Sequence, residues 1–223
     1  MSEHYARQLH SDHIPAGEHV NQGASELPRF TVTFASQTEQ DSPVLITSSG
    51  EAPLSAGLEL RLGDLIETRE GRVEIRDEHG MILRLGQQSE AAFEFDPNLK
   101  RHVFSYFGRG FKKRLTQLEP FTLQFCGKYR TSCYQCPCPI CIENHDPFTD
   151  IYYAFLAPVP VFEYDEHGEW FLITNIPEGY KATLVHDPSK PMRERYSVVG
   201  LEPITEADYD RITDEYLNPK RWR

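Results

Sequence analysis

The chain has 223 residues, 39% of them apolar and 26% charged, so it can bury a core as one large or two small globular units without covalent cross-links. Its 23 Lys and Arg residues against 34 Asp and Glu residues give a net charge of −11, which disfavours generic binding to phosphate backbones and anionic lipid surfaces. The composition also excludes collagen-like, coiled-coil and wholly disordered chains. We therefore expect protein partners, no nucleic acid and no direct membrane insertion.

Residues 1–28 are rich in Ser, Gly, Glu, His and Gln and have almost no apolar periodicity, which predicts a flexible or partner-ordered arm. The first residues show neither a basic segment nor an apolar one of the kind found in signal peptides. The sequence also contains no run of about 18 apolar residues. We expect a cytoplasmic protein, or a part of an assembly built in the cytoplasm. A neighbouring subunit is the simplest partner for the arm, which favours a homo-oligomer or a multi-subunit assembly.

From Phe30 the sequence changes to short β-type runs separated by turn residues, which predicts a mainly β body. In the run 72–76, Val73 and Ile75 alternate with polar residues and should share one face of a hairpin. The turn sequence Asp-Glu-His-Gly occurs at 77–80 and again at 165–168, which predicts two hairpins of the same kind. The runs lie at 30–34, 43–47, 58–62, 72–76, 81–85, 91–95, 102–107, 121–125, 152–156, 159–164, 169–175 and 180–185.

A cluster of basic residues surrounds the sequence Gly108-Arg109-Gly110, which resembles a turn. We interpret the segment as a solvated hairpin, with a contact for an acidic protein face as the alternative. The cluster comprises Lys100, Arg101, Arg109, Lys112, Lys113 and Arg114.

Only the C-terminal segment, residues 201–223, has the pattern of a helix. Thr205 and Asp208 have the spacing of a capping box, and Tyr209, Ile212 and Tyr216 would form one face of the helix. The basic tail after Pro219 is interpreted as a solvated end, with a docking tag as the alternative. The predicted fold is thus a twisted β-sandwich or β-solenoid-like body with one short C-terminal helix and a Cys-rich loop.

The stretch 57–95 resembles the FecR-like domain, named after the ferric-citrate regulator. The shared features are a Gly-Asp-x-Ile-x-Thr step that begins at Gly63, and a D-x-x-G turn from Asp77 to Gly80. Farther along, the Pro-Phe strand at 120–123 and the segments 159–164 and 177–185 resemble later parts of that family. On this basis residues 29–200 form a FecR-like β domain with a Cys-rich insertion at 126–145.

The resemblance implies a β fold used for protein interaction and signal relay, without catalytic residues. Family members commonly work in the periplasm, tethered to a membrane helix. This sequence differs, because it contains no apolar run long enough for such a helix. The insertion is the second difference, since it occupies the position where the family often has Gly-Thr.

All five cysteines lie within the insertion, and a histidine follows four residues after the last of them. Two Cys-x-x-Cys steps can each direct two thiolates at one ion, which is typical of structural zinc sites. Because a single residue separates the two steps, three of these thiolates with Cys126 or His145 would close the shell more readily. The candidate zinc ligands are Cys126, Cys133, Cys136, Cys138, Cys141 and His145.

The alternatives for this cluster are disulfides, an iron–sulfur cluster and unligated cysteines. An odd number of cysteines weakens a framework made of disulfides alone. We expect a non-enzymatic β-rich protein-interaction or structural module of a larger assembly, with a zinc-stabilised loop. The alternative function is thiol redox chemistry or electron transfer through an iron–sulfur cluster at the same cysteines. No sequence motif of a hydrolase accompanies them.

Overall fold

The computed structural model describes residues 29–36, 41–78, 80–96, 101–114, 132–133, 140–146, 148–164 and 170–222. The protein is mainly β, with 53% strand and 13% helix, and its antiparallel sheets do not close into a barrel. This confirms the predicted fold class. The arm at 1–28, the predicted strand at 121–125 and the second Asp-Glu-His-Gly turn lie outside the described residues.

A single nine-stranded antiparallel sheet, the large sheet, runs through the whole molecule in the order β17-β16-β13-β12-β10-β7-β6-β1-β4. Its first-half strands are β1 (Phe30–Ala35), β4 (Glu59–Leu60), β6 (Val73–Asp77), β7 (Met81–Leu85) and β10 (Arg109–Arg114). Its second-half strands are β12 (Ile140–Asp146), β13 (Thr149–Ala154), β16 (Tyr180–His186) and β17 (Tyr196–Pro203).

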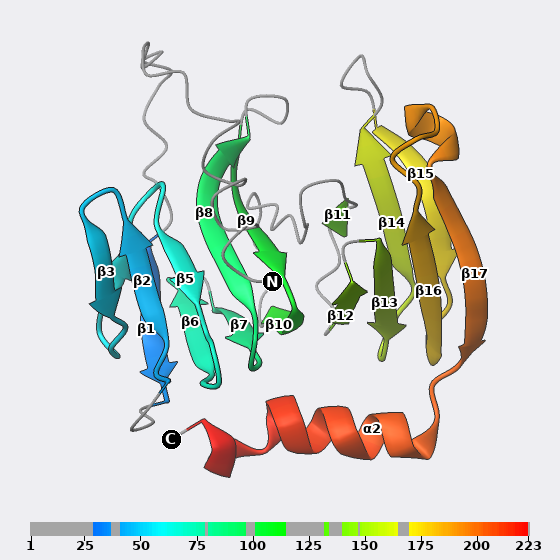
Figure 1. The fold of residues 1–223 in the computed structure, drawn as a ribbon. Helices are drawn as coiled ribbons and strands as arrows, with labels where there is room; N and C mark the ends of the chain where they lie inside the picture. Colours follow the sequence, from blue (N-terminus) through cyan, green and yellow to red (C-terminus); the bar gives the residue numbers. More distant parts are fainter. Residues whose placement is uncertain are drawn as a thin grey trace.

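Two smaller sheets cover one face of the large sheet, side by side (Figure 1). The five-stranded sheet, in the order β3-β2-β5-β8-β9, lies over the first half. The three-stranded sheet, in the order β11-β14-β15, lies over the second half. Their strands are β2 (Val44–Thr47), β3 (Gly50–Pro53), β5 (Leu65–Glu67), β8 (Glu90–Asp96), β9 (Arg101–Phe107), β11 (Ser132–Cys133), β14 (Val159–Tyr164) and β15 (Trp170–Ile176).

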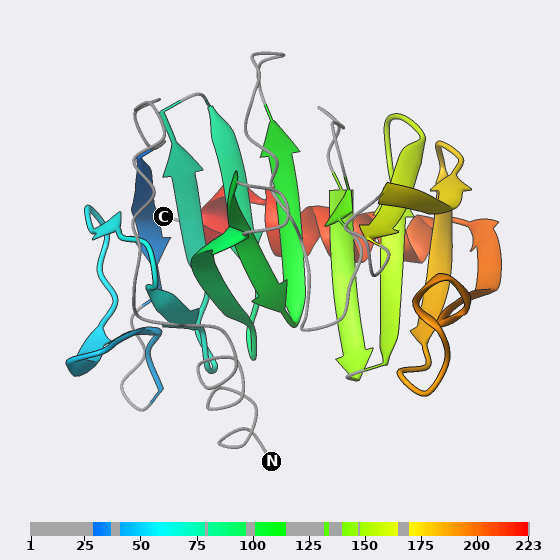
Figure 2. The ribbon, with the colours of Figure 1, turned by 90° about the horizontal axis from the view of Figure 1, so that it is seen from above.

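The C-terminal helix crosses the opposite face of the large sheet, as seen behind the strands in Figure 2. We call the face beneath the two smaller sheets the core face, and the face beneath the helix the helix face. The helical elements are η1 (Met192–Glu194), α2 (Glu206–Ile212), the π-helical turn η2 (Thr213–Leu217) and the 3₁₀ turn η3 (Pro219–Arg221).

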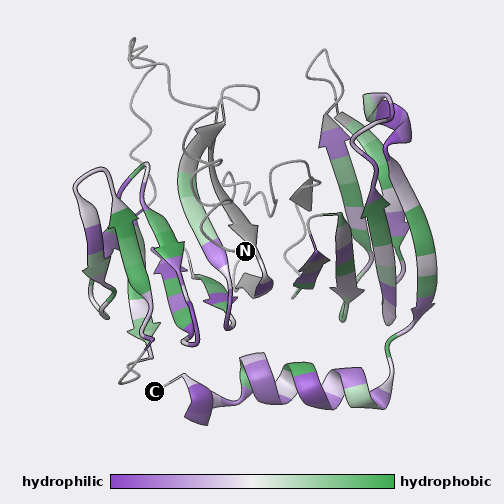
Figure 3. Ribbon diagram, viewed as in Figure 1, coloured by the Kyte–Doolittle hydropathy of each residue, from purple (hydrophilic) through white to green (hydrophobic). Residues whose placement is uncertain are grey.

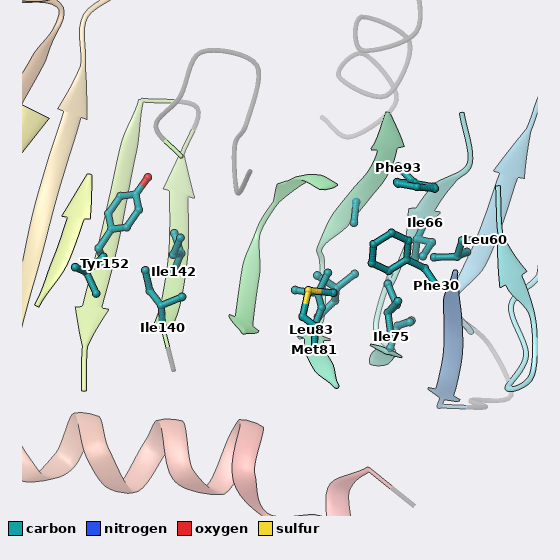
Figure 4. Close-up of a cluster of buried hydrophobic side chains, with 14 of the residues drawn as sticks. Phe30, Leu60, Ile66, Ile75, Met81, Leu83, Phe93, Ile140, Ile142 and Tyr152 are labelled. Carbon is teal, nitrogen blue, oxygen red and sulfur yellow. The ribbon is translucent and has the colours of Figure 1, made fainter. Parts of the chain in front are cut away.

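The hydrophobic core lies between the large sheet and the two smaller sheets, and it is one contiguous cluster. Phe30 of β1 and Phe93 of β8 meet edge to face across the first half, with ring centroids 4.9 Å apart. Figure 4 shows the side chains of Ile140, Ile142 and Tyr152 in the second half, above the helix. Two-residue alternation along each strand therefore directs apolar side chains to the core face.

The hairpin of β6 and β7 confirms the prediction from alternation. Val73 and Ile75 are fully buried, and the carboxylate of Asp77 accepts a hydrogen bond of 2.7 Å from the amide of Met81. Gly80 completes the turn with a φ of 84°, a value that favours glycine. The second predicted hairpin also forms, because Tyr164 of β14 pairs with Trp170 of β15.

The basic cluster was predicted to form a hairpin, and that prediction is wrong. β9 pairs with β8 in the five-stranded sheet, whereas β10 pairs with β7 and β12 in the large sheet. The chain changes sheet at Gly108, whose φ is 111° and whose added Cβ would lie 2.7 Å from the Cα of Ser89. Because only glycine fits this corner, it permits the chain to pass from one layer to the other.

The C-terminal helix begins as predicted. Thr205 is the N-cap and forms a capping box with Asp208, and Ile212 and Tyr216 are buried against the helix face. The tail, by contrast, is not a solvated end. Trp222 is buried, with its ring 5.6 Å from that of Phe34, and its indole N–H donates to the carbonyl of Glu215.

Candidate functional site

The cysteine-rich excursion leaves and re-enters the large sheet on neighbouring strands. β10 ends at Arg114, and the chain returns as β12, in which Ile140 pairs with Lys112 and Cys141 pairs with Phe111. The ladder between β10 and β12 thus closes the base of the excursion. Cys126, Cys136 and Cys138 lie outside the described residues.

The segment is more regular than the loop that was predicted, because three of the candidate ligands lie in strands. Cys133 is in β11 and pairs with Val161 of β14, in the sheet that covers the core face. Cys141 and His145 are in β12, and the ladder with β13 is irregular between Asn144 and Asp146. The sequence had a weak signal for β12, since the β-branched residues Ile140 and Ile142 lie two positions apart.

Cys141 is a fully buried thiol that belongs to the helix face. It packs in one cluster with Ile212, Tyr216 and Trp222, and it is not in a disulfide. Burial raises the pKa of this thiol well above its usual value, and the charge of Glu143 raises it further. As placed here, Cys141 packs among apolar side chains beneath the C-terminal helix.

Two of the predicted ligands, Cys133 and Cys141, lie in strands of different sheets. Cys133 belongs to a strand over the core face, whereas the side chain of Cys141 faces the helix on the other side of the large sheet. Within the described ranges, no group of three His, Cys, Asp or Glu side chains could hold a metal ion. The zinc site remains a prediction.

A second cluster, which sequence reasoning missed, is a set of buried charges beneath the C-terminal helix. Its centre is Glu143 of β12, whose side chain is 4% exposed. The two terminal guanidinium nitrogens of Arg211 both donate to this carboxylate, the longer contact being 3.2 Å. The hydroxyl of Tyr153 donates to it at 3.0 Å. The carboxylate is therefore satisfied from the helix and from the neighbouring strand.

The electrostatics of this group follow from burial and pairing. The pKa of Tyr153 is raised because the ring is buried and Glu143 is close, so the hydroxyl stays protonated. Burial opposes the charge of Arg211, but the hydrogen bond and charge of Glu143 overcome it and raise the pKa of the guanidinium. Both groups thus keep the protonation states that their hydrogen bonds require at all ordinary pH values.

Glu74 of β6 is the matching carboxylate in the first half of the sheet and is also buried. It accepts hydrogen bonds from Arg84 at 2.7 Å, from Arg76 at 2.8 Å and from the hydroxyl of Thr33 at 2.6 Å. Burial alone would raise the pKa of Glu74, but these three donors lower it. The carboxylate is charged at neutral pH.

Arg84 connects Glu74 to the end of the C-terminal segment. Its guanidinium donates to the backbone carbonyl of Tyr216 and lies 5.1 Å above the ring of Trp222. At the start of the helix, the ammonium group of Lys181 donates to Asp208 at 2.8 Å. The helix is therefore fixed to β16, β12 and β7, which span both halves of the large sheet.

This arrangement is suited to holding a helix in place. Glu143, Glu74 and Asp208 each have a cationic partner from a different element. Their partners lie far apart in the chain, since Glu143 and Arg211 are separated by 68 positions. Sequence spacing gives no signal for such pairs.

Among the described residues, none of the helices combines the length and apolar character needed to cross a membrane. The chain was compared with protein-family models, with curated proteins and with solved structures, and none of the three comparisons finds a match.

Proposed function

We propose that this chain is a non-enzymatic protein-interaction or structural module of a larger assembly, in which zinc stabilises the cysteine-rich excursion as a contact surface. The observation that carries the proposal is the register of β10 and β12, which pairs Lys112 with Ile140 at the base of the excursion. Because both ends of the excursion continue from paired strands in the middle of the large sheet, the positions of these two ends are fixed. A metal ion would then order its outer part at little further entropic cost.

The proposed zinc shell takes four ligands from Cys126, Cys133, Cys136, Cys138 and His145. Cys141 is left out because its thiol is buried beneath the helix, on the side of the large sheet opposite the strand that contains Cys133. Four protein ligands leave no coordination position for water, which makes the site structural rather than catalytic.

Membership in the FecR-like family is likewise a proposal. Two features support it: Gly63 adopts a φ of 89°, and Thr68 is buried with its hydroxyl donating to the carbonyl of Gly86 at 2.7 Å. The residues that carry the resemblance therefore serve turns and strand ends, as expected of a shared β framework. Such a framework implies protein contacts rather than catalysis.

The test is zinc content and thermal stability of three proteins purified without chelators. The unmodified chain should contain about one zinc per chain. The variant C136S/C138S should lose the metal and melt at a lower temperature, because binding energy of a structural ion is folding energy. The control C141S should keep its zinc, although it loses a packed side chain.

Each alternative gives a different result. A brown protein containing iron, or a reversible two-electron thiol–disulfide cycle, would replace the structural role with electron transfer or redox chemistry. Zinc loss from C141S alone would return Cys141 to the shell and contradict the assignment made here. A protein without any metal, with C136S/C138S melting normally, would overturn the proposal.

A further inference from the structure

β17 forms one edge of the large sheet and is its longest strand, with eight residues. It pairs with β16 on one side, and no strand of the described chain pairs with it on the other. Figure 2 shows it at the end of the row of strands. A long open edge offers backbone donors and acceptors to another strand, and natural sheets normally protect such edges.

Charged side chains and proline, two of the usual protections of an edge strand, are absent from most of β17. The six residues 196–201 include no charged residue and no proline. Val198, Val199 and Leu201 are 40%, 62% and 50% exposed, respectively, and Figure 3 shows the hydrophobic bands along this strand. Neighbouring exposed apolar side chains on an open strand favour burial against a partner.

The identity of the partner follows from an irregularity in the strand. The register with β16 shifts between Thr183 and Leu184, so Val199 is an extra residue between Val198 and Gly200. A regular strand from another protein would have to accommodate this bulge. A second copy of β17 carries the same extra residue at the same place. When two copies pair in antiparallel order, the numbers of residues on the two sides of the contact are therefore equal.

The charges at the two ends of β17 are complementary in that same arrangement. Arg195 precedes the strand, where its guanidinium donates to the carbonyl of Lys190 at 3.3 Å. Glu202 lies near the other end and is 64% exposed, with Lys181 at 3.7 Å. In an antiparallel pair, Arg195 of each copy lies opposite Glu202 of the other, and the apolar residues meet in the middle.

We propose that two copies of this chain associate through antiparallel pairing of their β17 strands, so that the large sheet continues across a two-fold axis near Val198 and Val199. The proposal rests on the function proposed above, of which it names one contact. Such an interface is isologous, as in most homodimers. It is built on few side chains, so we expect a dimer that dissociates on dilution.

Light scattering or sedimentation of the full chain tests this directly. Measurements in about 0.15 M salt screen the repulsion between two copies of charge −11, because the Debye length is then about 8 Å. The mass should rise with concentration from 25.7 kDa towards twice that value. V199K should remain monomeric, since it places two ammonium groups at the axis, whereas the control L156K, at a residue 67% exposed elsewhere, should dimerise normally.

A charge exchange separates self-pairing from other modes of association. R195E and E202R should each weaken the dimer by placing like charges opposite each other, and R195E/E202R should restore it. Rescue is expected only if the two residues meet across the interface in antiparallel order.

A chain that is monomeric at all concentrations, or a dimer unaffected by V199K, would overturn the inference. Neither result would alter the zinc content of the excursion. The dimer can therefore be disproved while the proposed function stands.

Discussion

The two faces of the large sheet are built from the same strands and yet are held by different forces. On the core face, alternate residues such as Leu83 and Ile142 join one apolar cluster. On the helix face, their neighbours Arg84 and Glu143 bind the C-terminal segment, Arg84 through the backbone carbonyl of Tyr216 and Glu143 through an ion pair with Arg211. Apolar contact is not directional, whereas a hydrogen-bonded ion pair has one geometry. The core face therefore supplies stability, and the helix face determines where the helix lies.

The largest expected effect comes from the core face. Leu83→Ala removes a fully buried side chain of β7 and should lower the free energy of unfolding by about 3–4 kcal/mol. Chemical denaturation measures the change. Leu62→Ala, at a residue 47% exposed, is the control and should change stability by no more than about 0.5 kcal/mol. Equal losses at both positions would contradict the location of the core.

Breaking the central ion pair of the helix face should have the next largest effect. Arg211→Met leaves the buried carboxylate of Glu143 without its cation. It should cost about 2–3 kcal/mol, less than the roughly 3–5 kcal/mol for a fully buried pair, because Arg211 is 39% exposed. The triple variant E143L/Y153F/R211M removes every polar member of the group. It should recover to within about 1 kcal/mol of the unmodified chain, since the buried carboxylate is removed together with its cation. A triple variant as unstable as Arg211→Met alone would show that desolvated charge is not the cause.

A substitution at the start of the helix should lower the free energy of unfolding by a smaller amount. Asp208→Ala removes the half of the capping box in which the Asp208 carboxylate accepts from the amide of Thr205, together with the ion pair with Lys181, and should cost about 1–2 kcal/mol. Amide hydrogen exchange should show the increased opening first in the helix. Asp210→Ala, at an exposed position of the same helix, is the matched control. Exchange that is unchanged in Asp208→Ala would mean that the helix is held by its apolar residues alone.

The last prediction concerns Glu74→Gln, in which glutamine keeps the shape and one acceptor oxygen while Arg84 loses its anion. Its signature is the pH dependence. Burial raises the pKa of Glu74, but hydrogen bonds from Thr33, Arg84 and Arg76 lower it overall. The stabilisation is therefore present above the unfolded pKa near 4.3 and is lost as pH falls through the lower folded value.

Denaturation at pH values from 7 to 3 should thus show a smaller loss of stability in Glu74→Gln than in the unmodified chain. Glu59→Gln, at an exposed position in β4, should leave the acid-induced loss unchanged. Parallel curves for Glu74→Gln and the unmodified chain would show that Glu74 has the same pKa in the folded and unfolded states.

Much of the fold was predictable, because alternation and turn residues are local signals. Val73 and Ile75 were predicted to share a face, and the capping box of Thr205 and Asp208 was predicted from spacing; both are confirmed. The corner at Gly108 was not, since a glycine that joins two sheets and one that closes a hairpin look alike in sequence. β17 was not predicted either, because Ser197 and Gly200 interrupt its run of residues that favour strands.

The candidate site was less predictable for a physical reason. The clustering of cysteines is visible in the sequence, but which of them share an ion depends on which face of a strand each one occupies. Cys141 shows this, since its alternation with Ile140 and Ile142 directs it to the helix face. The pairing of Glu143 with Arg211 depends on how the C-terminal helix crosses the sheet, and that crossing has no local signal.

X-ray absorption at the zinc edge tests the proposed role of the excursion most directly, because it reports the atoms bound to the ion. We predict three or four sulfur ligands at about 2.3 Å, unchanged in C141S and absent in C136S/C138S. A spectrum with only nitrogen and oxygen ligands, or sulfur ligands that decrease in C141S, would contradict this account.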